Sequence, residues 1–132
     1  MTKEDKQLLL KDLCARLPYH PIVSVAYNYA DKGIVWEFDV LRIKLLLEIE
    51  EEQSWEYIKP YLRPMSSMTE EECIALSKLT PYETDAWKYI KTPVPLYIAN
   101  IEQFDFFHRH HLDWRGLISK GLAIEAPEGM YK

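Results

Sequence analysis

The sequence is poor in glycine and cysteine, and this shortage excludes several classes of site. Its 4 glycines are scattered, so no glycine-rich loop is present that could hold a phosphate group. The 2 cysteines, Cys14 and Cys73, are far apart in the chain and belong to no CxxC pair, which argues against a zinc ribbon or a disulfide framework. Both lie in helical patterns beside leucines, so we expect two small buried hydrophobic residues. No GxSxG motif marks a serine nucleophile.

Long hydrophobic runs are also missing. No apolar stretch is long enough to span a bilayer, and the opening MTKEDKQLLLKDL mixes charge into the run where a signal peptide has an apolar core. We therefore expect a cytoplasmic protein that does not use a membrane. The formal net charge is -5, which makes nucleic acid an unfavourable partner because the phosphate backbone is negative as well.

What is present suits one globular unit. The chain has 132 residues, 48% of them hydrophobic and 13% aromatic. A chain of this size can bury roughly two thirds of the surface that its unfolded form exposes. We expect a single domain over residues 1–132, with a helix and β subregion at 1–60 and a helical subregion at 61–132.

The N-terminal subregion begins with a predicted helix. Thr2 can cap this helix and Pro18 ends it, and an i, i+3, i+4, i+7 pattern defines its apolar face. That face consists of Leu10, Leu13, Cys14 and Leu17.

Alternating residues then predict a small antiparallel sheet. Residues 23–29 and 34–40 alternate as strands around a turn at 30–33, and Trp36 fits the core by its phase. The apolar phase changes at residues 40–41, and for residues 41–49 we favour a third strand over a helix. A short fourth strand at 55–59 ends at Pro60.

The C-terminal subregion predicts short helices and an extended tail. Thr69 and Glu72 form a capping box that begins a helix carrying Cys73, Leu76 and Leu79. Further helices are expected at 81–91, from Asn100 through the histidines, and from an Asp113 cap to Gly121. The fold class is therefore α+β: an N-terminal helix, a small antiparallel sheet and C-terminal short helices. An SH3-like half barrel is the alternative form of the sheet.

The stretch HRHHLDWRG holds three of the 4 histidines. On a helix, His108 and His111 lie one turn apart and could bind a metal with Asp105 or Asp113, but a zinc site needs three or four ligands. The alternative is that these histidines extend an aromatic stripe and make hydrogen bonds at its edge, which the common spacing favours. We therefore predict no metal and no cofactor, and keep His108, His111 and Asp105 as weak candidates.

The aromatic and histidine-bearing C-terminal block is the candidate interface with a protein partner. Exposed Trp and Tyr near Arg are typical of interfaces, which selects Trp87, Tyr97, His110, Trp114 and Arg115. The alternative is that these side chains attach the C-terminal helices to the sheet, which burial statistics favour.

Three blocks of the sequence resemble a family of short uncharacterised proteins from gut anaerobic bacteria and their phages or integrated elements. The blocks are LLLKDLCARLPY, YLRPMSSMTEEE and HHLDWRGLISKGLAIEAPEGMYK, about half of the chain. The resemblance implies no catalytic residue. It implies a small accessory or partner-binding protein, in which His110 and His111 recur and the position of Trp114 is often Tyr.

These observations lead to three functional hypotheses. The first is a non-enzymatic accessory protein of a phage or mobile element that acts through a protein interface. The second is a nucleic-acid-binding module on the small β region. The third, which the sequence favours least, is a metal-dependent hydrolase at the histidines.

Overall fold

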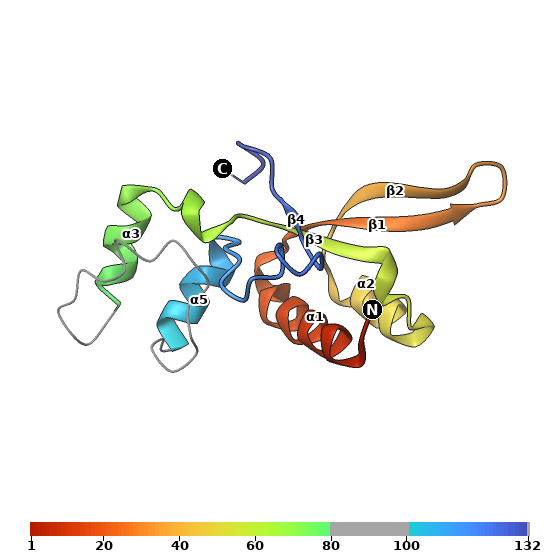
Figure 1. Ribbon diagram of the computed structural model, residues 1–132, viewed down its shortest axis with the longest axis horizontal. Coiled ribbons are helices and arrows are strands. Elements are labelled where there is room, and N and C mark those ends of the chain that lie inside the picture. Colours follow the sequence, from red (N-terminus) through yellow and green to blue (C-terminus); the bar gives the residue numbers. More distant parts are fainter. Residues whose placement is uncertain (80–100, 132) are drawn as a thin grey trace.

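A computed structural model describes residues 1–79 and 101–131. The fold is α+β, with an N-terminal helix, a sheet curled into a half barrel, and C-terminal helices, as the sequence predicts. In chain order the elements are α1 (Lys3–Arg16), η1 (Leu17–Tyr19), β1 (Ile22–Tyr29), β2 (Gly33–Val40), α2 (Ile43–Glu52), η2 (Trp55–Tyr57), β3 (Ile58–Leu62), η3 (Met65–Ser67), α3 (Glu70–Ser77), α5 (Ile101–Arg109) and β4 (Ile124–Glu125). Helices α1 and α2 lie on one side of the sheet, and the β1–β2 hairpin extends beyond them (Figure 1).

Helix α1 begins and ends where the sequence predicts. Thr2 and Asp5 form a reciprocal capping box, and the helix ends at Arg16, just before Pro18. The predicted apolar face is shifted by one residue, because the buried side chains are Leu9, Asp12, Leu13 and Arg16. This stripe has the expected spacing but contains an ion pair, which hides it from a purely apolar pattern. Cys14 is consequently exposed, contrary to the prediction, whereas Cys73 is buried as predicted.

The β1–β2 hairpin forms as predicted, but its register reverses the expected exposure of β2. Tyr29 pairs with Gly33, so the loop is one residue shorter than the predicted turn, and Gly33 has the expected positive φ of 75°. A shift of one residue moves every side chain of a strand to the opposite face. Trp36 therefore lies away from the core, and its predicted burial is wrong.

Residues 43–52 form helix α2, so the predicted third strand is wrong. Leu41, Leu45, Leu46 and Ile49 are buried, and they follow the spacing of one helical face. Ile43 and Leu47, which the strand pattern groups with them, are exposed. Leucine, lysine and glutamate are also good helix formers, and this preference outweighs the odd-numbered alternation.

The predicted fourth strand is displaced toward the C-terminus. Residues 55–57 form the short helix η2, and β3 continues through Pro60 to Leu62. Pro60 is the last residue of β3 in the ladder with β1, where its missing N–H costs least. The sheet order is β2-β1-β3-β4, and β4 pairs parallel to β3, so the sheet is mixed. The expected extended tail thus contributes the edge strand β4.

In the helical subregion the predicted caps at Thr69 and Asp113 form, but the helix predicted after Asp113 does not. Thr69 and Glu72 form the expected capping box of α3, and residues 66–67 turn the chain in η3. Asp113 accepts hydrogen bonds from the backbone N–H groups of Leu117 and Ile118 at 2.7 and 2.9 Å. It caps a series of turns, so the predicted helix to Gly121 is wrong. The helix predicted at 81–91 and the Asn100 cap lie outside the described residues.

The described residues form three hydrophobic clusters in the interior. One joins α1, β1, α2 and Trp55, and a second joins α3, α5, Met68 and Trp114. A smaller third cluster around Leu62 and Leu117 lies under the C-terminal turns. No described helix has the length and apolar character needed to cross a membrane.

Candidate functional site

His108 belongs to the interior of the helical region. It is buried, and its Nε2 accepts a hydrogen bond from the indole N–H of Trp114 at 3.0 Å. Burial, aided by the positive charge of Arg16, lowers the pKa of His108 to about 4. The ring is therefore a neutral acceptor near neutral pH, which matches the interpretation of a hydrogen-bonding edge to an aromatic stripe.

His111 and Asp105 contact different residues of the chain. His111 lies beyond the end of α5 with a φ of 58°, and its ring stacks on Tyr131 at 3.8 Å between centroids. Asp105 accepts hydrogen bonds from the hydroxyl of Tyr19 and from Arg109. Within residues 1–79 and 101–131, no group of three or more His, Cys, Asp or Glu could hold a metal ion. The weak metal candidates are thus not brought together.

His110 lies beside an ion pair that links α3 to the residue following β3. Arg63 donates to both carboxylate oxygens of Glu72 at 2.8 and 2.6 Å, and His110 Nδ1 is 3.3 Å from the same carboxylate. The hydrogen bonds from Arg63 hold the pKa of Glu72 near 2 despite burial. Burial lowers the pKa of His110. The carboxylate is therefore a poor general base, although an open cavity of about 870 Å³ adjoins this group.

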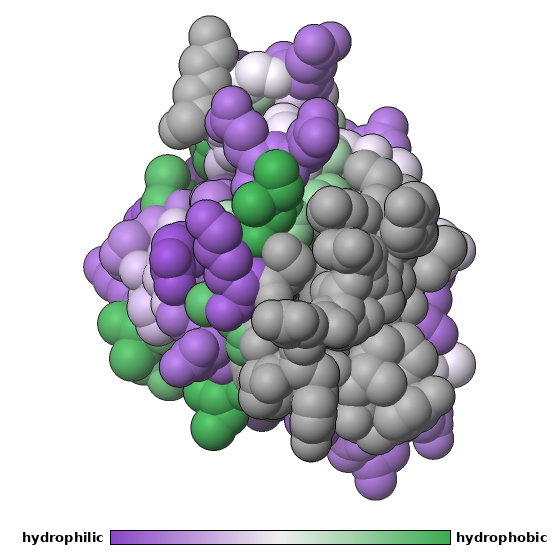
Figure 2. Space-filling view, turned by 90° about the vertical axis from the view of Figure 1, so that its left-hand side faces the viewer, coloured by the Kyte–Doolittle hydropathy of each residue, from purple (hydrophilic) through white to green (hydrophobic). Residues whose placement is uncertain are grey.

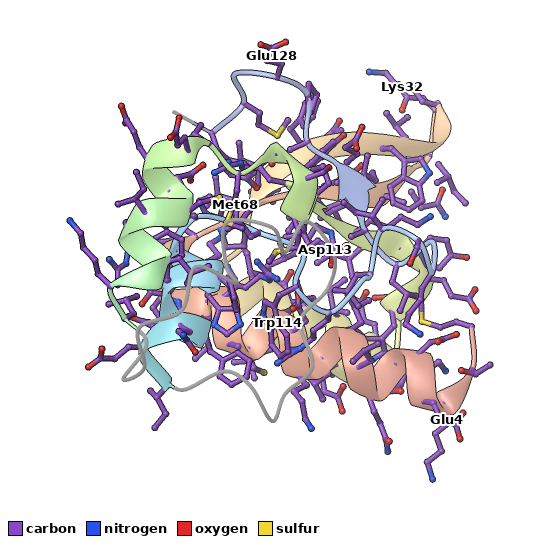
Figure 3. All side chains as sticks on the ribbon, turned by 60° about the vertical axis from the view of Figure 1, so that its left-hand side comes forward. Glu4, Lys32, Met68, Asp113, Trp114 and Glu128 are labelled. Carbon is purple, nitrogen blue, oxygen red and sulfur yellow. The ribbon has the colours of Figure 1, made fainter. Side chains whose placement is uncertain are left out.

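Trp114 and Arg115 are packed inside the molecule. Trp114 is only 4% exposed, its ring lies 4.6 Å from that of Phe104, and Arg115 stacks over it at 4.2 Å. Figure 3 shows Trp114 and Asp113 in the interior, between α5 and α1. This arrangement follows the packing alternative rather than the exposed interface. Trp87 and Tyr97, the other aromatic candidates, lie outside the described residues.

A buried charge network joins α1 to the C-terminal segment. Arg16 is fully buried, donates to Asp12 at 2.8 Å, and donates to the carbonyl oxygen of Leu112 at 2.7 Å. Arg115 approaches the same carboxylate at 3.5 Å. Sequence reasoning missed this network, although Asp12 and Arg16 at positions i and i+4 on the stripe of Leu9 are its signal.

Within residues 1–79 and 101–131, a continuous exposed apolar surface lies on β2. Four alternate side chains, 45 to 69% exposed, point from one face of this strand; we call them the apolar row, and they are Ile34, Trp36, Phe38 and Val40. They lie opposite Ala26, Ser24 and Ile22 of β1, and thus on the face that α1 and α2 leave uncovered. The alternation that marks the row is visible in the sequence, where its phase predicts the buried face of the strand instead of the exposed one.

A hydrogen-bonded aspartate and a surface hollow lie next to the apolar row. Asp39, on the other face of β2, accepts hydrogen bonds from Tyr27 at 2.9 Å and from Arg42 at 2.7 Å. At the end of the row, Ile22, Phe38, Asp39, Val40 and Met130 line a hollow of about 490 Å³.

The end of the molecule formed by α3 and α5 differs from this face. Figure 2 shows that hydrophilic residues predominate there among the described ones, with hydrophobic residues isolated between them. Single exposed hydrophobic side chains are ordinary, whereas a contiguous group marks an interaction surface. The apolar row is therefore the better candidate for binding.

Comparison of the chain with protein-family models, curated proteins and solved structures found no match. The candidate site consequently depends on its geometry alone.

Proposed function

We propose that this protein is a non-enzymatic interaction protein that binds an extended segment of polypeptide along β2. The observation that carries this proposal is the apolar row, because it lies on a strand at the edge of the sheet. An edge strand offers unpaired backbone N–H and C=O groups to an added strand, and alternate side chains supply the specificity. The added strand would extend the sheet beside Trp36 and Phe38 and cover part of their exposed rings.

The described candidate residues of the C-terminal block make internal contacts, which supports a structural role for them instead of a role in binding. Trp114 and Arg115 are occupied by internal contacts, and Glu72 and His110 are bound to each other and to Arg63. A phage or mobile-element origin, which the sequence resemblance implies, would suit a small accessory protein. That origin stays a prediction.

The experiment is a capture of host proteins with matched variants. Tagged wild-type protein, Phe38→Lys and Leu47→Lys are purified from the native host, and circular dichroism confirms that all three fold. Phe38 and Leu47 are similarly exposed, at 69% and 61%, but only Phe38 belongs to the apolar row. We expect a protein retained by the wild type and by Leu47→Lys to be lost with Phe38→Lys. Equal retention by all three would contradict the proposal.

Nucleic-acid binding is the second candidate, because the same exposed rings could stack on bases. Lys59 lies on the face of Phe38, since both pair with Ser24. The net charge of -5 and the acidic Glu37 and Asp39 on the same strand make this function less favourable. A salt-sensitive gel shift of single-stranded RNA or DNA that Phe38→Ala removes would favour it over a protein partner.

A further inference from the structure

We infer that the strand which pairs with β2 is β2 of a second copy of this chain, antiparallel about a two-fold axis at Trp36. This inference rests on the proposed function and names its partner. Strand β2, with the sequence GIVWEFDV, contains no proline or lysine, and its ladder with β1 runs without a bulge from Val40 to Gly33. Proline, lysine and bulges are among the devices that protect an edge strand from pairing, and β2 has none of these three. A second copy always provides a strand of matching length, and self-pairing of this kind has the two-fold symmetry common in oligomers.

Charge selects the register of this pairing. With the axis at Trp36, residues 33–39 pair with the same segment of the second copy, so Phe38 faces Ile34 and Glu37 faces Val35. With the axis at Glu37, this carboxylate would lie opposite its own copy, and with the axis at Phe38 it would lie opposite Asp39. Like charges directly opposite each other destabilise a strand pair. Only the Trp36 register joins the two apolar rows at this length without that repulsion.

The same register brings complementary charge to the end of the row. Lys32, at the exposed tip of the hairpin, would lie opposite Val40 of the second copy (Figure 3). There it would reach the hollow of about 490 Å³ that Asp39 lines beside Phe38 and Val40. The pairing thus brings Lys32, whose ammonium group lies 5.8 Å from the centre of the Tyr29 ring in its own chain, toward the end of β2 where Asp39 of the other copy lies, once at each end of the paired segment.

The first test is the mass of the protein in solution. Sedimentation and light scattering, from about 1 µM to about 500 µM protein, should show twice the 15.7 kDa of one chain as the concentration rises. Phe38→Lys should raise the dissociation constant by about 30-fold or more, because it places a charge among the paired apolar side chains of the interface. Leu47→Lys, on α2, should leave the constant unchanged.

The second test measures the register by cross-linking. In a Cys14→Ser background, Ile34→Cys and Phe38→Cys are prepared as two separate variants. Directly opposed residues have the Cα separation that a disulfide requires. A mixture of the two variants should therefore form a disulfide-linked dimer on mild oxidation, while each variant alone should not. Cross-linking of Phe38→Cys with itself would indicate the register that opposes Glu37 and Asp39, and would overturn the proposed axis.

The outcomes separate this inference from the proposed function. A mass of one chain at every concentration, or a dimer that Phe38→Lys leaves intact, overturns self-pairing. If a host protein is still captured through Phe38 in that case, the proposed function stands with a different partner. A dimer lost with Phe38→Lys, with heterologous cross-links between residues 34 and 38, supports the inference whether or not a host protein is captured.

Discussion

Strand β2 and the segment after α5 both carry large aromatic side chains, but they use them in opposite ways. In β2, Trp36 and Phe38 point from the uncovered face of the sheet. In the C-terminal segment, Trp114 is enclosed by Phe104, Phe107 and Arg115. The difference lies in what surrounds them, because α1 and α2 form the second layer on only one side of the sheet (Figure 1).

A surface that binds a partner and a surface that packs within the chain can thus contain the same types of residue. An aromatic ring stabilises a fold in proportion to the area that the same chain removes from water. Trp114 has its polar atom satisfied by His108 and little area left for a partner. The apolar row keeps much of its side-chain area exposed to water, so burying that area against a partner can stabilise an association.

The largest effect is expected for Trp114→Ala. Removing a buried tryptophan costs about 3–5 kcal/mol of unfolding free energy, and the loss of the indole N–H leaves His108 Nε2 without its donor, which adds about 1–3 kcal/mol. Denaturant unfolding followed by circular dichroism measures this loss. Trp114→Phe keeps most of the apolar volume and should lose considerably less. A fall below about 1 kcal/mol for Trp114→Ala would show that the ring is not an internal packing element.

An intermediate effect is expected from acid, through His108. Its pKa is about 4 in the folded protein and 6.5 ordinarily, so the unfolded chain binds the proton first as the pH falls. Stability from this group is complete above pH 6.5 and is lost between pH 6.5 and 4. Between pH 7 and 5 the loss from this group should be on the order of 2 kcal/mol. His108→Gln keeps an acceptor for Trp114 and should show a flatter profile over this range in denaturant unfolding. An unchanged profile would contradict the buried neutral state.

The local signals in the sequence predicted much of the fold. The cap at Thr2, the capping box at Thr69, the stop at Pro18 and the positive φ at Gly33 are all confirmed. These features depend on a few neighbouring residues, whose hydrogen bonds and allowed dihedral angles are set locally. The α+β class followed from them.

The exposure of particular side chains was harder to predict because it depends on contacts distant in sequence. A turn one residue shorter than expected reversed the faces of β2, and alternating leucines did not distinguish a strand from helix α2. The candidate site was affected most. Trp114 was chosen for the interface and Trp36 for the core. The cluster of α3 and α5 encloses Trp114, whereas α1 and α2 cover the face of the sheet opposite Trp36.

The smallest effect on stability is expected for Phe38→Ala. This side chain is 69% exposed and its ring lies 5.4 Å from that of Tyr61 between centroids, so its loss should lower the unfolding free energy by about 1 kcal/mol or less. Denaturant unfolding at a low protein concentration measures this contribution of the single chain. Repeating it at high concentration should enlarge the difference from the wild type, because only the wild type gains stability from association. A loss of about 3 kcal/mol at every concentration would mean that β2 packs its row within the chain, and the contrast with Trp114 would disappear.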